Sequence, residues 1–241
     1  MTNREWFKQA GFGMMVHFGL YSLIGGEWNG RRTPLIGEWA QSYFRIPNRE
    51  YERLAQAFNP VLFCADDWVQ LAQEAGMQYI VVTAKHHEGF ALFDTNYDRY
   101  NCVTGAPFGR DLIAELAEAC AKHHMKLGLY YSQELDWHEP DGGGYGAREL
   151  NCGCMSWTND WDFPDNAHKN YARLFETPAT LNDTWGYKPF DENWKSAEEV
   201  LRLKRHLNAR GINYLLNVGP DPMGRIPAPA QEILRRVGTL G

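Results

Sequence analysis

The sequence predicts an α/β protein in which short parallel strands alternate with amphipathic helices, as a sheet or a (β/α) barrel. Several strand-sized segments are continuous apolar runs, which is typical of parallel strands covered on both faces. Helical segments with apolar residues three and four positions apart stand between these runs. Polar side chains gather just after the strands, and in a (β/α) barrel these positions converge on one rim, where active sites lie.

The first half of the chain begins with the strand GMMVHFG, residues 13–19. The helix DDWVQLAQEAG comes later, with Asp66 or Asp67 as its N-cap and Gly76 at its end. Between these two elements a helix is expected from Asn48, because its apolar residues share one helical face. These residues are Tyr51, Leu54, Ala55 and Phe58.

The middle of the chain predicts a strand-helix-strand unit. Its elements are the strand 79–85, the helix 110–124 and the strand 126–132. Both strands, YIVVTAK and KLGLYYS, are again continuous apolar runs, so we expect them to lie parallel and buried in the same sheet.

The last part of the chain predicts a helix, a strand and a final helix. Ser196 and Glu199 form a capping box, and Gly211 ends the helix that they begin. The strand NYLLNVG covers residues 213–219, and the last helix begins near Pro227.

The predicted strands are too few for a closed barrel. Four strands are expected, and TPATLND, residues 177–183, is a candidate for a fifth, whereas a closed barrel of this type has eight. We therefore expect one domain, residues 1–241, in which part of the barrel is missing.

Length and composition exclude several classes of protein. A chain of 241 residues forms one large domain or at most two. The net charge of −6 and the absence of a Lys/Arg-rich run argue against nucleic-acid and membrane partners, and no apolar stretch reaches the ~18 residues of a membrane span. The first residues, MTNREWFKQA, lack the apolar core of a signal peptide. A cytoplasmic protein is expected, or a secreted or periplasmic one if the N-terminus is truncated.

Cysteine and aromatic content give weaker indications. The five cysteines are odd in number and scattered, which fits reduced thiols better than disulfides. Cys152 and Cys154 lie in a Gly-rich loop without a second cysteine pair, so we interpret them as a loop feature rather than a metal site. The aromatic content of 14%, with nine tryptophans, is typical of a rich core or of a carbohydrate site, because ring faces cover the apolar patches of sugars.

Polar residues that follow the predicted strands are expected to line one pocket. A zinc site of His17, His86 and His87 is disfavoured, because adjacent histidines at a strand end point apart and no HExxH-type spacing is present. We expect neither a metal nor another cofactor. The polar residues in question are His17, His86, His87, Glu88, Ser132, Gln133, Glu134 and Asn217.

Six motifs together carry a family resemblance. In chain order they are GMMVHFGLYS, GEWA, TAKHHEGFALFDT, KLGLYYS, NDTWGYKP and LLNVGPDPMGRIP. Their combination, which covers nearly the whole chain, resembles the α-L-fucosidases of glycoside hydrolase family 29. The resemblance implies a (β/α) TIM-type barrel that removes terminal α-L-fucose with retention of configuration, and a fucosylated glycan or fucoside as its partner.

The resemblance implies a substrate-binding role for five residues. His17, His86 and His87 match histidines that hold fucose hydroxyls. Glu38 and Trp39 match a pair that hydrogen-bonds to the sugar and packs against it. Fucose is uncharged, so neutral imidazoles and a carboxylate can exchange hydrogen bonds with its hydroxyls while aromatic rings cover its methyl group.

Two further aromatic residues are assigned to the same pocket. A tyrosine of KLGLYYS contacts the sugar in the family, and we favour Tyr131 over Tyr130. Trp185, in the DTWGY stretch, is interpreted either as a site residue or as packing.

The catalytic carboxyls are only partly accounted for. A retaining glycosidase uses an acid/base and a nucleophile about 5 Å apart. The resemblance implies Glu176 as the acid/base, because it stands nine residues before Trp185, with Phe175 in place of the family's tryptophan. The same glutamate also reads as the end of a helix, NYARLFE.

The nucleophile of the family, an aspartate at the end of the fourth strand, has no counterpart at its expected place. The resemblance therefore implies that about strands 4 to 6 are missing, near residues 175–177. For a sheet left open in this way three outcomes are expected as alternatives: a smaller, irregular barrel, pairing with a second copy as a homo-oligomer, or marginal stability. Other carboxyls are available, but spacing selects none of them: Glu134, Asp136, Glu139, Asp141, Asp162 and Asp165.

The sequence therefore predicts an α-L-fucosidase by family. Whether this chain turns over substrate is left undecided by the sequence, because its usual nucleophile is absent. The alternatives are a non-catalytic fucose-binding protein and an inactive fragment.

Overall fold

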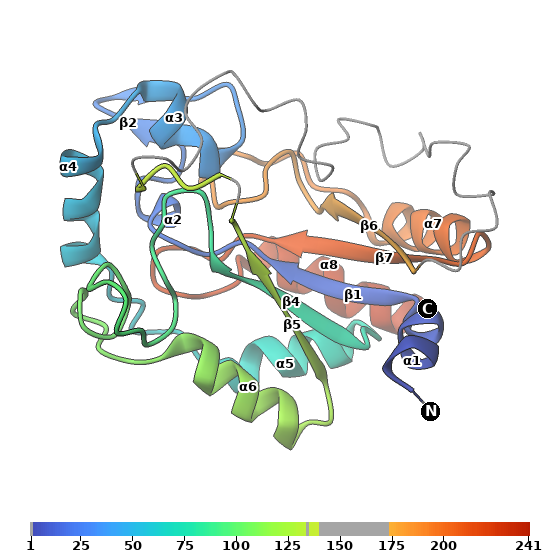
Figure 1. Ribbon diagram of the computed structural model, residues 1–241. Helices are drawn as coiled ribbons and strands as arrows, with labels where there is room; N and C mark the ends of the chain where they lie inside the picture. Colours follow the sequence, from blue (N-terminus) through green and yellow to red (C-terminus); the bar gives the residue numbers. More distant parts are fainter. Residues whose placement is uncertain (1, 134, 140–173) are drawn as a thin grey trace.

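The sheet is a row of five parallel strands. The computed structural model describes residues 2–133, 135–139 and 174–241. The strand order is β5-β4-β1-β7-β6, with β1 at the centre (Figure 1). All neighbouring strands are parallel, so their carboxyl ends lie at one edge. The strands are Phe12–Val16 (β1), Tyr79–Lys85 (β4), Lys126–Tyr131 (β5), Phe175–Thr180 (β6) and Ile212–Val218 (β7).

Four helices cover one face of the sheet. They contact one another in the order α6-α5-α8-α7, which follows the row of strands beneath them (Figure 1). Contacts of α6 with β5, of α5 with β4 and of α7 with β7 attach the helices to the sheet. The helices are Ala65–Glu74 (α5), Leu112–Lys122 (α6), Ala197–Asn208 (α7) and Ala228–Leu240 (α8).

Both faces of the central strands are buried, as their continuous apolar runs predicted. Met14 of β1 belongs to the large core on the helix side, together with Ile80 of β4. Its neighbour Met15 points the other way, into a smaller cluster with Tyr79 and Leu215. Side chains on a strand alternate between its faces, so one apolar run supplies both layers.

Short elements complete the described part of the chain. Helix α1 precedes β1, and the segment between β1 and α5 lies beyond the carboxyl ends of the strands (Figure 1). No helix among the described residues is long and apolar enough to cross a membrane. The short elements are Asn3–Ala10 (α1), Tyr21–Ile24 (α2), Glu27–Trp28 (β2), Arg31–Arg32 (β3), Gly37–Trp39 (η1, a 3-10 helix), Ala40–Phe44 (α3), Asn48–Tyr51 (α4) and Glu52–Ala57 (η2, a 3-10 helix).

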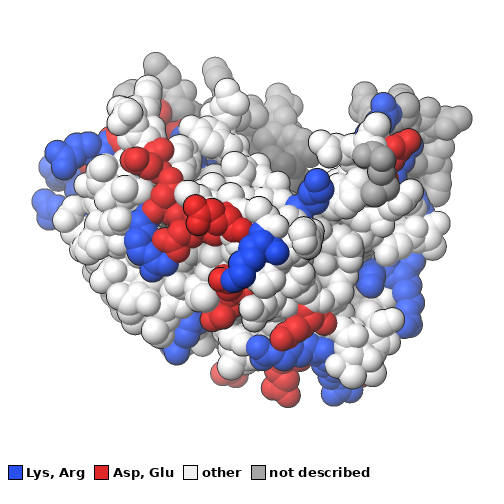
Figure 2. Space-filling model, turned by 90° about the horizontal axis from the view of Figure 1, so that it is seen from below, with Lys and Arg blue, Asp and Glu red and all other residues white. Residues whose placement is uncertain are grey.

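Ion pairs join adjacent helices on the outer surface. Figure 2 shows acidic and basic side chains beside one another on the face seen from below. Lys122 of α6 lies 2.9 Å from Asp66 of α5, and Arg235 of α8 lies 2.9 Å from Glu74 at the end of α5. Exposed pairs of this kind contribute about 0–1 kcal/mol each, so the helices are held mainly by the apolar core.

The four expected strands are confirmed, with bounds that differ by a few residues at most. The fifth candidate is also a strand, although it begins at Phe175 rather than at Thr177. Glu176 therefore lies in a strand and not at the end of a helix. Ser196 caps α7 as predicted, since its hydroxyl accepts from the backbone N–H of Glu199 at 3.1 Å.

Two helical predictions are wrong in detail. The helix from Asn48 is a single α-helical turn, Asn48–Tyr51, followed by the 3-10 helix Glu52–Ala57. The N-cap of α5 is Cys64, while Asp66 and Asp67 lie inside its first turn, where the helix dipole stabilises negative charge without a capping bond. The cysteine pair Cys152 and Cys154 lies outside the described residues.

A glycine in β1 allows an aromatic ring to cross the sheet surface. A Cβ atom at Gly13 would lie 2.4 Å from the ring of Tyr79 on the neighbouring strand. We expect Gly13→Ala to lower the free energy of unfolding by about 1–3 kcal/mol through overpacking. Gly128→Ala in β5 is the matched control, because the nearest atom to its Cβ would be a methyl carbon of Val81, at 3.2 Å. Urea unfolding measures both, and equal losses would contradict this account.

Candidate active site

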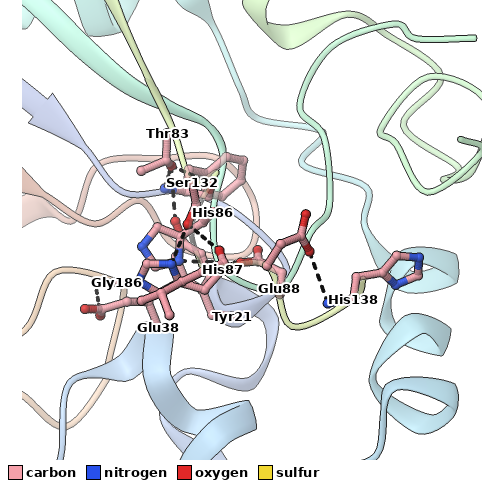
Figure 3. Close-up of polar contacts among 12 residues, drawn as sticks. Tyr21, Glu38, Thr83, His86, His87, Glu88, Ser132, His138 and Gly186 are labelled. Atoms are coloured by element: carbon pink, nitrogen blue, oxygen red, sulfur yellow. Dashed lines mark hydrogen bonds and ion pairs between the residues drawn. The ribbon is translucent and has the colours of Figure 1, made fainter. Parts of the chain in front are cut away.

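Three histidines meet at the carboxyl edge of the sheet. His17 follows β1, and His86 and His87 follow β4. The ring centroids of His17 and His86 are 5.3 Å apart, and those of His86 and His87 are 4.0 Å apart. Figure 3 shows His86 and His87 beside each other. The expectation that the adjacent pair points apart is wrong. Both histidines lie beyond Lys85, the last residue of β4, so the alternation of side chains along a strand does not apply to them.

Asn217 orients His17. Its Oδ1 lies 2.6 Å from the Nδ1 of His17, and its Nδ2 donates to the carbonyl of Trp185 at 2.8 Å. The amide N–H is therefore engaged, and Oδ1 accepts from an Nδ1–H of His17. Burial and the neighbouring His86 hold the pKa of His17 well below its usual range. His17 is thus a neutral imidazole whose Nε2 is a hydrogen-bond acceptor.

Ser132 orients His87 in the same way. Its hydroxyl donates to the carbonyl of Leu135 at 2.5 Å and lies 2.6 Å from the Nδ1 of His87. The single hydroxyl proton is used on Leu135, so the oxygen accepts from Nδ1–H and the Nε2 of His87 is again an acceptor. Burial lowers the pKa of His87 to about 2 and that of His86 to about 3.

Aromatic rings surround the histidines. The ring centroid of Trp185 lies 5.2 Å from that of His17, and Trp39 lies edge-on to His87 at 5.6 Å. Trp137, which lies in none of the six motifs, has its ring 5.2 Å from that of His87 and 5.6 Å from that of Trp39. The tryptophans are partly exposed while the histidines are buried, so the rings form the walls of a site whose floor is polar.

The structure brings Tyr130 to the histidines, and not Tyr131, which the sequence favoured. Tyr130 lies 5.7 Å from His86 and 6.3 Å from His17, measured between ring centroids. Tyr131 is 53% exposed, and its ring lies 4.8 Å from the Nζ of Lys85. Neighbouring residues of a strand point to opposite faces, so only one of the two tyrosines can turn toward the histidines.

Glu38 joins two distant stretches of the chain at this edge. Its Oε2 accepts from the backbone N–H of Gly186 at 2.9 Å (Figure 3), and the N–H of Gly37 donates to Thr184 at 2.7 Å. The GEW and DTWGY motifs therefore lie side by side, and Trp39 and Trp185 both contact the histidine cluster. Burial raises the pKa of Glu38 to about 7, although the bond from Gly186 opposes part of the rise.

The structure does not bring Glu176 to the histidines. Glu176 stands opposite Asn213 in the β6–β7 register, four residues before Asn217, which corresponds to about 13 Å along the strand. Its Oε2 accepts from the hydroxyl of Tyr79, the first residue of β4, at 2.6 Å. Glu176 is therefore at the amino end of the sheet, opposite to the edge where the histidines meet.

Of the other carboxyls considered from sequence, the structure describes Asp136 and Glu139. Asp136 is buried at the histidine edge and forms an ion pair with Lys85. Glu139 is exposed. Glu134, Asp141, Asp162 and Asp165 lie outside the described residues.

A cluster of neutral histidines bordered by aromatic rings, at the carboxyl end of a parallel α/β sheet, suits an uncharged, hydroxyl-rich substrate such as a sugar. Fold and site together indicate a carbohydrate-binding α/β protein, the class to which many glycoside hydrolases belong. The family model described as Alpha-L-fucosidase matches residues 1–151 and 147–240. The chain belongs to this α-L-fucosidase family.

Solved structures and curated relatives agree on the family. The unliganded α-L-fucosidase AlfC from Lactobacillus casei is 39% identical, with a TM-score of 0.89, and the match covers 99% of this chain and 98% of that one. An α-L-fucosidase from Vibrio sp. strain EJY3 is 29% identical, with a TM-score of 0.82, over 99% of this chain and 54% of that one. Human plasma α-L-fucosidase is 34% identical over 312 residues, which cover 97% of this chain and 66% of the relative.

The buried carboxyls of the site predict a pH dependence of stability. Burial raises the pKa of Glu38 to about 7 and that of Glu88 to about 8, from an ordinary value of 4.5. From about pH 4.5 up to the folded pKa, about 7 for Glu38 and about 8 for Glu88, the unfolded chain loses the proton while the folded chain keeps it, so each group lowers stability as the pH rises through its window. The double variant Glu38→Gln/Glu88→Gln should gain stability relative to the original chain between pH 5 and pH 8, by on the order of a few kcal/mol.

Urea unfolding at pH 5, 6.5 and 8 measures this difference. The histidines also change stability with pH, in the opposite direction, but they do so in both chains and cancel in the comparison. Glu232→Gln, at an exposed position of α8, is the control and should show no trend. A stability difference that stays constant from pH 5 to pH 8 would contradict the protonated state of the two carboxyls.

Proposed function

We propose that the site binds the terminal α-L-fucosyl group of a glycan or fucoside and hydrolyses its glycosidic bond with retention of configuration. The observation that carries the proposal is the pair of oriented acceptors, Nε2 of His17 and Nε2 of His87, beside a buried carboxyl and aromatic walls. Sugar hydroxyls donate to such nitrogens, and ring faces cover the methyl group and the C–H bonds. Trp39, Tyr130 and Trp185 supply these faces.

Complexes of the Lactobacillus casei enzyme support this substrate class. AlfC has been solved with its product α-L-fucose, and a variant of it with a 4-nitrophenyl α-L-fucopyranoside substrate and with the disaccharide Fuc(α1,6)GlcNAc. These chains are about 40% identical to this one and align over 99% of it. The disaccharide Fuc(α1,6)GlcNAc is therefore the natural-type substrate to test on this chain.

Retaining hydrolysis proceeds in two displacements. A carboxylic acid protonates the leaving oxygen while a carboxylate attacks the anomeric carbon, and the glycosyl–carboxylate ester is then hydrolysed by water with the first group acting as base. Glu38 has the properties of the acid, because it is buried at the histidine edge and its pKa is about 7. We assign the role to Glu38 rather than to Glu176, whose position at the opposite end of the sheet is unsuited to it.

No carboxyl of the described residues is clearly suited to be the nucleophile, so a function without catalysis is also considered. Asp136 is at the same edge, but its ion pair with Lys85 weakens it as a nucleophile. The human relative aligns over 312 residues, so at least 312 − 241 = 71 of its positions have no counterpart here. Together with the strands β5 and β6 at the edges of the described sheet, this supports an incomplete barrel that retains the fucose-binding half of the site. Fucose binding without turnover is therefore the second candidate.

Two variants distinguish the acid candidates. Glu38→Gln keeps an acceptor for Gly186 but removes the acidic proton, whereas Glu176→Gln changes only the amino end of the sheet. We expect Glu38→Gln to reduce kcat about 10²–10⁴-fold on Fuc(α1,6)GlcNAc, and less on 4-nitrophenyl α-L-fucoside, because nitrophenolate leaves without protonation. Glu176→Gln should leave both rates within a few-fold of the original.

Product release and calorimetric titration with L-fucose are the measurements. A large loss in Glu176→Gln alone would return the acid role to that residue. Fucose binding without turnover would support the binding protein, and a folded chain that binds neither L-fucose nor either fucoside would contradict the proposal as a whole. D-Fucose serves as the control sugar, since it has the same groups in the mirror-image arrangement.

A further inference from the structure

Glu88 is a buried carboxyl that the proposed reaction does not use. Its Oε2 lies 3.6 Å from the Nδ1 of His86, with 1% and 4% of the two side chains exposed. Among the described residues, neither the two carboxyl oxygens of Glu88 nor the Nδ1 of His86 has a hydrogen-bond partner. An unpaired buried polar group is destabilising by about 1–3 kcal/mol, so two such groups that face each other are expected to interact. Rotation of the carboxyl or a bridging water closes the remaining distance.

We infer that Glu88 is a positioning residue that fixes the tautomer of His86, and so decides whether this imidazole offers the substrate a donor or an acceptor. The inference rests on the proposed binding of fucose in the histidine pocket. It concerns a residue next to the histidine pair and not one of the groups that contact the sugar.

The backbone is built to admit the Glu88 carboxyl. A Cβ atom at Gly19 would lie 2.4 Å from Oε1 of Glu88, so any other residue at this position would displace the carboxyl. Tyr21, which bonds to Thr83 at 3.2 Å, lies edge-on to His86 with ring centroids 5.3 Å apart. The segment after β1 therefore forms a wall that holds both members of the pair.

Neighbouring rings also prevent His86 from turning away. His17 and His87 lie on two sides of it, at centroid distances of 5.3 and 4.0 Å, and Tyr130 lies at 5.7 Å. A buried imidazole held by rings on several sides has little freedom to flip, so its Nδ1 stays directed at Glu88 (Figure 3).

Protonation then determines the tautomer. Burial raises the pKa of Glu88 to about 8 and lowers that of His86 to about 3, so a neutral carboxyl faces a neutral imidazole at pH 7. The backbone amides of Glu88 and Leu20 oppose part of the rise without reaching hydrogen-bond geometry. The other charged or titratable groups that face Glu88 are Lys85, Asp136, Glu38, Tyr21, Tyr51 and Tyr100.

The consequence is a division of roles among the histidines. The carboxyl O–H of Glu88 donates to the Nδ1 of His86, which leaves the imidazole proton on Nε2. His86 is then a donor, whereas His17 and His87 are acceptors. Every sugar hydroxyl can both donate and accept, so a mixed set of partners distinguishes the orientation of neighbouring hydroxyls better than three equal ones.

The test reads the tautomer directly. Long-range ¹H–¹⁵N NMR of the imidazoles is recorded from pH 6 to pH 9.5, with the His86 signals assigned by His86→Gln. The original chain should show Nε2–H at pH 6.5 and change to Nδ1–H with a midpoint near pH 8, where Glu88 ionises and becomes an acceptor. Glu88→Gln, whose amide donates at every pH, should keep Nε2–H throughout. Glu88→Leu fills a similar volume without a donor and should give mixed tautomers.

Fucose affinity is measured in parallel. We expect Glu88→Leu to weaken L-fucose binding about 5- to 10-fold, Glu88→Gln to bind like the original chain at pH 7, and only the original chain to lose affinity above pH 8. Glu232→Gln is the control. A His86 tautomer that is the same in all variants and at all pH values overturns the inference. A tautomer change without any fucose binding supports the role of Glu88 and contradicts the proposed function instead.

Discussion

The hydrogen bond between His17 and Asn217 is the contact on which the candidate site depends. It joins the end of β1 to β7, two strands that are neighbours in the sheet although about 200 residues separate them in the chain. The side-chain amide of Asn217 also donates to the carbonyl of Trp185, and the backbone N–H of the next residue, Gly186, donates to Glu38. One path of bonds therefore aligns the first histidine, a tryptophan wall and the buried carboxyl. Each of these groups is placed by backbone that belongs to a different part of the sequence.

The second constraint is that the titratable side chains of the site are buried in their uncharged forms, and this explains the chemistry of the site. The histidines have lowered pKa values and the carboxyls Glu38 and Glu88 have raised ones, in each case mainly because burial disfavours the charged form. The site is thus a set of neutral donors and acceptors, which suits an uncharged sugar better than an anion or a cation. A carboxyl kept protonated near neutral pH is also what a glycosidase requires of its general acid.

The amino end of the sheet has a different character. Tyr79 lies over Gly13, contacts the rings of Trp6 and Phe7, and donates to Glu176. Burial raises the pKa of Glu176 as well, so a raised pKa alone does not identify a catalytic carboxyl. Position at the carboxyl edge separates Glu38 from Glu176, because parallel strands bring their functional loops together at that edge only.

The sequence by itself determined the class of fold, four strands, the family and the three histidines that meet at the carboxyl edge. Continuous apolar runs, helix caps and motifs such as TAKHHEGFALFDT are local patterns. They can be identified in the sequence without knowing which residues contact one another in the fold. Only the tertiary structure decided which end of β6 carries Glu176, that Tyr130 rather than Tyr131 faces the histidines, and that His86 and Glu88 oppose each other. These features depend on strand register, on the parity of a side chain along its strand and on the course of a loop beyond the last strand residue. A shift of one residue reverses the direction of a strand side chain, and no local pattern in the sequence is that exact.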